Sequence, residues 1–154
     1  MPVKPIPDGY PAVIPYLIVA GAGRAIEFYR QVFGAKVRSL LDGSGGKVGH
    51  AELEIGDSVV MLADEHPEIG ALAPPSVGGT PVGLHLYLDD VDTVVAKALA
   101  AGARLKGAVE TKFYGDRLGS IIDPFGHLWH ITTHVEDVSP DEIARRAALM
   151  ARGG

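Results

Sequence analysis

The chain has 154 residues, 47% of them hydrophobic and 21% charged, which is typical of one globular domain or of two small modules sharing a core. Its 19 acidic and 14 basic residues give a formal net charge of −5, which disfavours nucleic-acid binding. No apolar run is long enough to span a membrane. The absence of cysteine excludes disulfides, thiolate zinc sites and cysteine nucleophiles. We therefore expect a cytoplasmic protein that binds neither nucleic acid nor membrane.

The first half of the chain predicts a strand, a helix and three further strands. A proline-rich arm precedes an apolar run at 13–19, which predicts a strand with Pro15 near its start. Apolar residues at helical spacing predict a helix over 22–33, ended by Gly34. A strand at 36–41 and a glycine-rich loop at 42–46 follow. Strands at 48–55 and 58–63 then form a hairpin around Gly56-Asp57.

The second half repeats this order after a linker at 64–81, which is rich in proline and glycine and shows no periodicity. A strand is predicted at 83–88, a helix at 90–101 and a strand at 104–109. A hairpin of strands at 112–122 and 127–134 closes the repeat around 123–126. At the end, Ser139, Pro140 and Glu142 predict the capped start of a helix over about 140–151.

These elements predict an α+β fold of two tandem βαβββ modules, arranged as a cupped mixed β-sheet with helices on its outer face, plus a C-terminal helix. The first module covers about 12–63 and the second about 82–134, within one domain spanning 1–154. A duplicated module explains why the same element order occurs twice.

Strand alternation divides the side chains between two faces of the sheet. In the first hairpin, one face is uniformly apolar and is expected to pack on the helices. The other face collects candidate ligand-binding residues from both modules. These are Tyr16, His50, Glu52, Met61, His85, Tyr87, Arg117, Leu128 and His130. Histidine and tyrosine mixed with Met and Leu favour a lined cleft, although a solvated polar face is the simpler interpretation.

Several segments resemble one known superfamily. The runs YLIVAGAGRAIEFYRQVFGA and IIDPFGHLWHITTH are similar to the vicinal oxygen chelate superfamily. The runs GHAELEIGDSVVMLADE and FYGDRLGSIIDPFGH resemble its PhnB-like glyoxalase/bleomycin-resistance branch. The resemblance covers about residues 12–136. It implies paired βαβββ modules that form a cup, and a homodimer.

The resemblance also implies one divalent metal in the cup, such as Zn, Ni, Mn or Fe, held by the first and last strand of each module. The corresponding positions here are Ile14, Met61, Gly83 and His130, and of these only His130 can bind such an ion. A shifted site would combine His130 with His85 and Glu52 as a two-histidine, one-carboxylate set. No cofactor is therefore assigned with certainty.

Arg117 has two interpretations. An arginine on the cleft face would bind a carboxylate or phosphate of a ligand. A structural ion pair with Asp116 or Glu110 is the alternative.

Three functions follow from this sequence. The first is a non-enzymatic protein that holds a small organic molecule in the cup, in the manner of drug sequestration. The second is a metal-dependent lyase, isomerase or thiol transferase of the glyoxalase I type, using the shifted site. The third is a non-catalytic interaction module that uses the proline-rich arm and the 64–81 loop.

Overall fold

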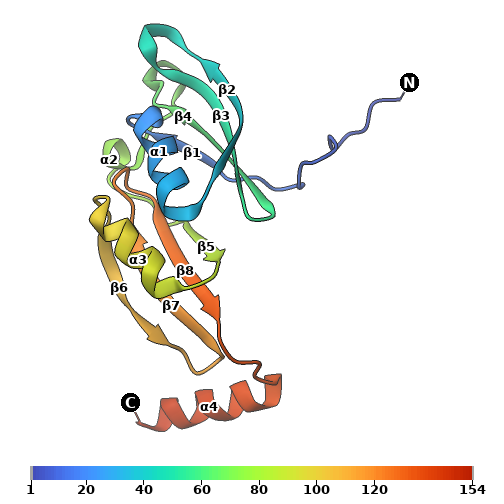
Figure 1. Cartoon of the computed structure of the whole chain (residues 1–154), viewed down its shortest axis with the longest axis vertical. Helices are drawn as coiled ribbons and strands as arrows, with labels where there is room; N and C mark the ends of the chain where they lie inside the picture. Colours follow the sequence, from blue (N-terminus) through green and yellow to red (C-terminus); the bar gives the residue numbers. More distant parts are fainter. Residues whose placement is uncertain (1, 154) are drawn as a thin grey trace. The chain divides into compact units, whose positions relative to one another are not determined.

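The computed structural model of the chain describes residues 2–153, which divide into two compact units. Unit one comprises residues 2–81 together with Pro124–His127, and unit two comprises Val82–Asp123 together with residues 128–153. Each unit has the order strand, helix and three strands, with its helix on one face of a four-stranded sheet (Figure 1). The fold is therefore α+β, with two βαβββ modules.

Unit one contains β1 (Tyr16–Val19), α1 (Ala22–Phe33), β2 (Lys36–Asp42), β3 (Val48–Ile55) and β4 (Ser58–Asp64). The strand order is β1-β4-β3-β2, in which β1 runs parallel to β4 and the other pairs are antiparallel. The helix 22–33 is confirmed at both ends. Gly34 ends it in the left-handed conformation, at φ +70°, and its N–H donates to Arg30 O.

The predicted hairpin of unit one has the expected register, because Ile55 pairs with Ser58 and Glu52 with Met61. One face therefore carries a continuous apolar set, which is buried beneath α1: Ala51, Leu53, Ile55, Val60 and Leu62. The opposite face carries Tyr16, His50, Glu52 and Met61, as alternation predicted.

The linker prediction was incomplete. Residues 64–81 contain two short helices, η2 (Pro67–Ile69) and α2 (Pro74–Val77), and the loop at 42–46 contains a 3-10 turn, η1 (Ser44–Gly46). Proline occupies the first turn of both linker helices, where its missing N–H costs nothing. Helices this short have no room for a periodic pattern, so no periodicity marks them in the sequence.

Unit two contains β5 (Gly83–Tyr87), α3 (Val91–Ala100), β6 (Arg104–Thr111), β7 (Asp116–Ile122) and β8 (Leu128–His134). The strand order is β5-β8-β7-β6, again with one parallel pair, β5 with β8. Trp129 and Ile131 are buried, as expected. Asp90 precedes α3, and its carboxylate accepts from the Thr93 N–H and hydroxyl.

The register of the second hairpin corrects one prediction. Ile122 pairs with Leu128, so the connection has five residues rather than the four expected. Ser120 therefore lies opposite His130, and Arg117 lies opposite Thr133. A shift of one residue turns each side chain to the other face, so Arg117 does not share the face of His130. The wider connection holds Phe125, which is buried near Phe28 and Tyr29 of unit one.

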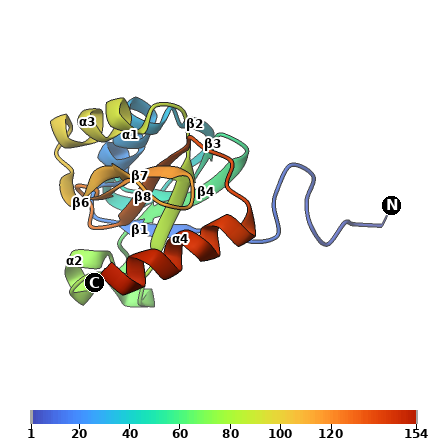
Figure 2. The ribbon, with the colours of Figure 1, turned by 90° about the horizontal axis from the view of Figure 1, so that it is seen from below.

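The C-terminal helix α4 (Pro140–Gly153) follows β8 through a short segment (Figure 1) and runs two residues beyond the expected end. Ser139 caps it by accepting from the Glu142 N–H at 3.2 Å, which forms one half of the predicted capping box. The Glu142 carboxylate instead binds Arg145 and Arg146. None of the described residues of α4 is buried, although Glu142, Ile143, Arg146 and Ala147 are half-buried. Figure 2 shows the course of the helix.

Candidate functional site

A cavity of about 590 Å³ opens on the polar face of unit one. Tyr16, Ile18 and Ala63 line it from β1 and β4, and the loops at 43–49 and 64–71 supply the rest of the wall. Three of the lining residues are acidic, Asp64, Glu65 and Glu68, and one is Lys47; the carboxylates of Asp64 and Glu65 already accept bonds from backbone N–H groups. The cavity therefore combines apolar with mainly acidic lining residues, and its volume lies in the range usual for small-molecule sites.

Asp64, at the end of β4, connects the loop at 43–49 in the cavity wall to the start of α1. One carboxylate oxygen accepts from the N–H groups of Gly21 and Ala22 at 2.9 and 2.8 Å, and the other accepts from Val48 N–H at 2.8 Å. Burial by itself would raise the pKa of Asp64, but these three donors outweigh it and hold the pKa below its ordinary value. Asp64 thus fixes the start of α1 and the start of β3 at the end of β4.

Four polar side chains form a continuous hydrogen-bonded chain beside the cavity. The Tyr16 hydroxyl lies 2.8 Å from His50 Nδ1, and His50 Nε2 lies 3.0 Å from Glu52. The other oxygen of Glu52 accepts from the Tyr10 hydroxyl at 2.5 Å. Three of these residues were predicted site residues, and the fold joins them directly. We name the set Tyr16–His50–Glu52–Tyr10 the unit-one relay.

Charge assigns the direction of each bond in the relay. Hydrogen bonds from Tyr10 first, and then from His50, lower the pKa of Glu52, so its carboxylate is ionised and accepts both bonds. His50 therefore donates from Nε2, and in the neutral form of the ring its Nδ1 accepts the Tyr16 proton. Burial, and then the nearby Glu52 charge, raise the pKa of Tyr16 and keep it a phenol. Tyr16 is also one of the residues that line the cavity, and its oxygen retains acceptor capacity.

In unit two, β5 and β8 bring His85 and His130 opposite each other, with ring centroids 6.1 Å apart. His130 Nδ1 lies 2.7 Å from the Ser120 hydroxyl, and His85 Nε2 lies 3.0 Å from the Thr132 hydroxyl. Burial is the main reason that the pKa of His130 falls below its ordinary value, with smaller effects from His85 and Lys106. His130 is therefore a neutral imidazole at neutral pH.

Gly83 makes room for this imidazole. A Cβ at position 83 would lie 2.7 Å from His130 Nε2, closer than real Cβ contacts. We expect Gly83→Ala to displace the His130 ring and to break its bond to Ser120, because the backbone of β5 is held by its pairing with β8. Proton NMR of the His130 ring, compared between the two proteins across pH, measures this. An unchanged His130 titration would contradict the prediction.

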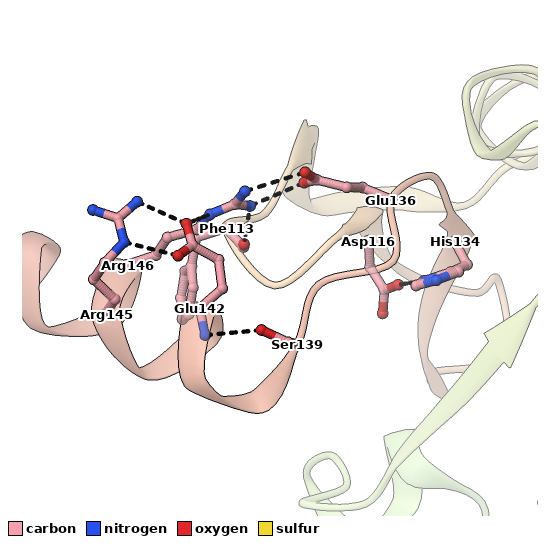
Figure 3. A network of polar contacts seen from close by, with 8 residues as sticks. All are labelled: Phe113, Asp116, His134, Glu136, Ser139, Glu142, Arg145 and Arg146. Carbon is pink, nitrogen blue, oxygen red and sulfur yellow. Dashed lines mark hydrogen bonds and ion pairs between the residues drawn. The ribbon is translucent and has the colours of Figure 1, made fainter.

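A second polar chain lies where β8 meets the segment leading to α4. The buried Asp116 accepts from the Tyr87 hydroxyl and from His134 Nδ1, both at 2.7 Å, and His134 Nε2 lies 2.7 Å from Asp137. An open hollow of about 510 Å³ adjoins this group. Figure 3 shows the same region binding α4, where Arg146 holds Glu136 and the carbonyl of Phe113.

His134 predicts a pH dependence of stability. Its bond to Asp116, and then its bond to Asp137, raise the pKa of His134 above the ordinary 6.5. A raised pKa means that the protonated ring favours the folded state. This contribution is complete below pH 6.5 and is lost as the pH rises through the raised pKa. We expect His134→Asn to lower Tm more at about pH 5.5 than at about pH 9. An equal reduction at both pH values would contradict this assignment.

The described residues do not provide a metal site of the expected kind. No group of three or more His, Asp or Glu side chains close enough to hold an ion occurs among residues 2–153. His85 and His130 lie together in unit two, each bonded to a hydroxyl, whereas Glu52 belongs to unit one and is bound to His50 and Tyr10. The shifted three-residue set stays a prediction.

The contacts of Arg117 decide between its two interpretations. Its guanidinium holds both oxygens of Asp92 on α3, at 2.7 and 2.9 Å, and also donates to Thr111. It is thus a structural ion pair, as the alternative proposed, but with a partner on the helix side rather than Asp116 or Glu110. Leu128 and Tyr87 lie on the same face as His85 and His130, as expected from alternation.

Sequence reasoning missed several residues of these groups. Tyr10 comes from the proline-rich arm, where no periodicity places a side chain. Ser120 and Asp116 were missed because the hairpin register was off by one residue. Asp64 was assigned to the linker. It is the last residue of β4, and an acidic residue directly after the predicted strand 58–63 is a feature that the sequence shows.

The two four-stranded sheets, each covered by one helix, and the polar faces opposite those helices define a class of small α+β proteins with duplicated βαβββ modules. Residues 12–131 match the Glyoxalase/Bleomycin resistance protein/Dioxygenase superfamily, and the chain belongs to that family. The described part of the chain contains no helix long and apolar enough to cross a membrane.

Comparisons with individual proteins agree with this assignment. An uncharacterized protein of Mycobacterium tuberculosis is 42% identical over 146 residues, covering 93% of this chain and 85% of that protein. TioX from Micromonospora is 28% identical, with a TM-score of 0.62, over 80% of this chain and 98% of TioX. A PhnB protein from Bacillus cereus, 19% identical over 80% of this chain and 99% of that protein, has the same fold with a TM-score of 0.62.

Proposed function

We propose that this protein binds a small organic molecule, without transforming it, in the cavity on the polar face of unit one. The observation that supports this most is the cavity itself, of about 590 Å³, which has an apolar floor and polar walls. Sites of roughly 300–1,000 Å³ with a few placed polar groups are typical of drug-sized ligands. The bleomycin-resistance members named in the family description make sequestration of a drug the natural form of such binding.

The charges and hydrogen-bonding groups of the cavity favour a ligand that is rich in donors. Three acidic residues and one lysine are among the residues that line the cavity. When the neutral His50 ring engages the Tyr16 proton, the Tyr16 oxygen offers only acceptor capacity to a ligand. An aromatic or amphipathic amine satisfies both features, because its ammonium group meets carboxylates while its apolar part lies over Ile18 and Ala63.

A binding measurement tests this proposal. Acridine orange serves as an aromatic cation, and anilinonaphthalene sulfonate serves as an aromatic anion of comparable size. We expect saturable one-to-one binding of the cation by fluorescence titration, and weaker binding of the anion. Ile18→Trp fills the cavity and is expected to weaken cation binding by about tenfold or more, because the burial of a drug-sized ring is lost.

Val13→Trp provides the matched control, because Val13 is 85% exposed and is not among the lining residues. This variant is expected to bind the cation as the wild type does. Circular dichroism establishes that both variants are folded. Equal binding by Ile18→Trp and the wild type would place the ligand elsewhere, and a preference for the anion would refute the proposed ligand charge.

The metal-dependent reaction is kept as the second candidate, because His85 and His130 lie side by side and His130 is a neutral imidazole. Elemental analysis of the purified protein decides between the two candidates. Stoichiometric metal that is lost in both His130→Ala and His85→Ala favours the enzyme. Under the binding proposal, neither variant changes the metal content.

A homodimer in the cytoplasm is our expectation for the assembly and location of this binding protein. The edge strands β1 and β5 each leave one side of a sheet without a partner strand within the described part of their own unit. Natural proteins usually cover such edges. Sedimentation velocity at micromolar concentration checks the assembly, and a stable monomer would contradict it.

A further inference from the structure

The N-terminal arm contacts the polar face of unit one through the side chain of Tyr10. A turn closed by the bond from Tyr10 N–H to Pro7 O directs the Tyr10 side chain toward β2 and β3. Gly9 adopts a positive φ of +81°, and its carbonyl accepts from Arg38 at 3.0 Å. The arm is thus attached to the face through Tyr10 and the neighbouring Gly9.

The groups around the Tyr10 ring form a receptor for a phenol. Glu52, which is only 7% exposed, accepts the hydroxyl proton at 2.5 Å. The Arg38 guanidinium lies over the ring, 4.6 Å from its centroid, which is cation–π geometry. His50 binds the second oxygen of Glu52 and so holds the carboxylate in place. A phenol is recognised here by both its hydroxyl and its ring.

Both residues of this receptor belong to strands of the sheet, whereas Tyr10 belongs to the N-terminal arm. Glu52 pairs with Ser39 on β2 and with Met61 on β4, and Arg38 lies on β2 at the register shift between Val37 and Ser39. Tyr10 belongs to an arm whose residues are otherwise exposed, and it reaches the face without being part of a strand or helix. The carboxylate of the site is therefore held by the sheet, whereas Tyr10 is held in place by its own contacts with Glu52 and Arg38.

We propose that Glu52 and Arg38 form a binding site for a phenolic small molecule, and that Tyr10 occupies this site as a displaceable internal ligand. Neither residue lines the 590 Å³ cavity, so the site does not depend on the function proposed for that cavity. A free phenol competes with the arm for the same carboxylate and the same guanidinium. Its binding releases the arm from the sheet.

Competition has a measurable consequence. If the arm leaves the site open in about one molecule in ten, the apparent affinity for an external phenol falls about tenfold. Tyr10→Ala removes the internal ligand and is expected to raise the affinity for 4-methylphenol by about that factor. Binding is followed through the amide shifts of Glu52 and Arg38 in the labelled full-length chain. Ile6→Ala changes the same arm at an exposed position and is expected to bind like the wild type.

Toluene tests the role of the hydroxyl, because it has the same ring and methyl group without the donor. We expect Tyr10→Ala to bind 4-methylphenol at least about tenfold more tightly than toluene, since a charge-assisted bond to Glu52 is available only to the phenol. In Tyr10→Ala/Glu52→Gln this preference is expected to shrink to about threefold or less, because the charge of the acceptor is gone.

Three results would overturn the proposal. Equal affinity of the wild type and Tyr10→Ala for 4-methylphenol would mean that Tyr10 does not occupy the site. Equal affinity of Tyr10→Ala for phenol and toluene would mean that the face binds rings without recognising the hydroxyl. Absence of saturable shifts in Tyr10→Ala, with dispersed spectra that establish folding, would mean that there is no site.

Discussion

Asp64→Ala is expected to lower the free energy of unfolding by about 3 kcal/mol and to abolish ligand binding in the cavity of unit one. The carboxylate satisfies three backbone N–H groups, from Gly21, Ala22 and Val48. These donors belong to the first turn of α1 and to the start of β3, and an alanine side chain has no acceptor for them. The loop at 43–49, which lines the cavity, loses its attachment to β4 at the same time.

Two further variants make this prediction specific. Asp64→Asn keeps one oxygen for Gly21 and Ala22 but turns an amide group toward Val48 N–H, so about half of the loss is expected. Asp57→Ala removes an exposed carboxylate from the turn of the same unit, and its effect is expected to stay within about 0.5 kcal/mol. Urea unfolding followed by circular dichroism measures all three. Equal effects of Asp64→Ala and Asp57→Ala would refute the role of Asp64.

The pH dependence of the Asp64 contribution has a defined sign. Because the pKa of Asp64 is lowered in the folded protein, the ionised carboxylate favours the folded state. The stabilisation is present above the ordinary value of 3.8 and is lost as the pH falls through the lowered folded pKa. The stability difference between the wild type and Asp64→Ala should therefore shrink in acid.

Trp129→Ala is expected to lower the free energy of unfolding by about 3–5 kcal/mol, which is the usual range for removing a buried aromatic side chain. Trp129 is 2% exposed in the core of unit two, and its Nε1–H donates to Asp123 at 2.9 Å. Asp123 is itself 3% exposed. The variant therefore both opens a cavity and takes a donor from a buried carboxylate.

Trp129→Phe separates these two effects. It keeps a ring in the core but removes the N–H, so a loss of about 1–3 kcal/mol is expected. Leu105→Ala, at a position 50% exposed, is the control and is expected to cost about 1 kcal/mol or less. Circular dichroism follows unfolding, because both Trp129 variants lack the only tryptophan of the chain. A loss in Trp129→Ala no greater than in Trp129→Phe would contradict the cavity argument.

Local patterns in the sequence predicted most of the elements. The helix over 22–33 was placed correctly at both ends, because its apolar spacing and Gly34 are local features. The hairpin around Gly56-Asp57 had the correct register, since a two-residue turn allows only one pairing. That register places His50, Glu52 and Met61 on one face, so strand alternation and turn length are enough to group these three residues.

Where a longer connection joined two strands, the same reasoning failed. Residues 123–127 form a five-residue connection, and an assumed four-residue turn turned Arg117 to the wrong face. This connection holds Phe125, which is buried near Phe28 and Tyr29 of α1, far away in the sequence. A contact at that separation leaves no periodic trace in the local sequence.

The sequence by itself determined the duplicated βαβββ order, the apolar and polar faces of the first hairpin and the family to which the chain belongs. These depend on residue type, spacing and turn length, which are local properties. Only the tertiary structure decided that Tyr10 reaches Glu52, that Asp64 joins α1 to β3, and that Arg117 binds Asp92. Each of these contacts joins residues that are distant in the chain, and such pairs form only when packing fixes where the strands, the helix and the arm lie.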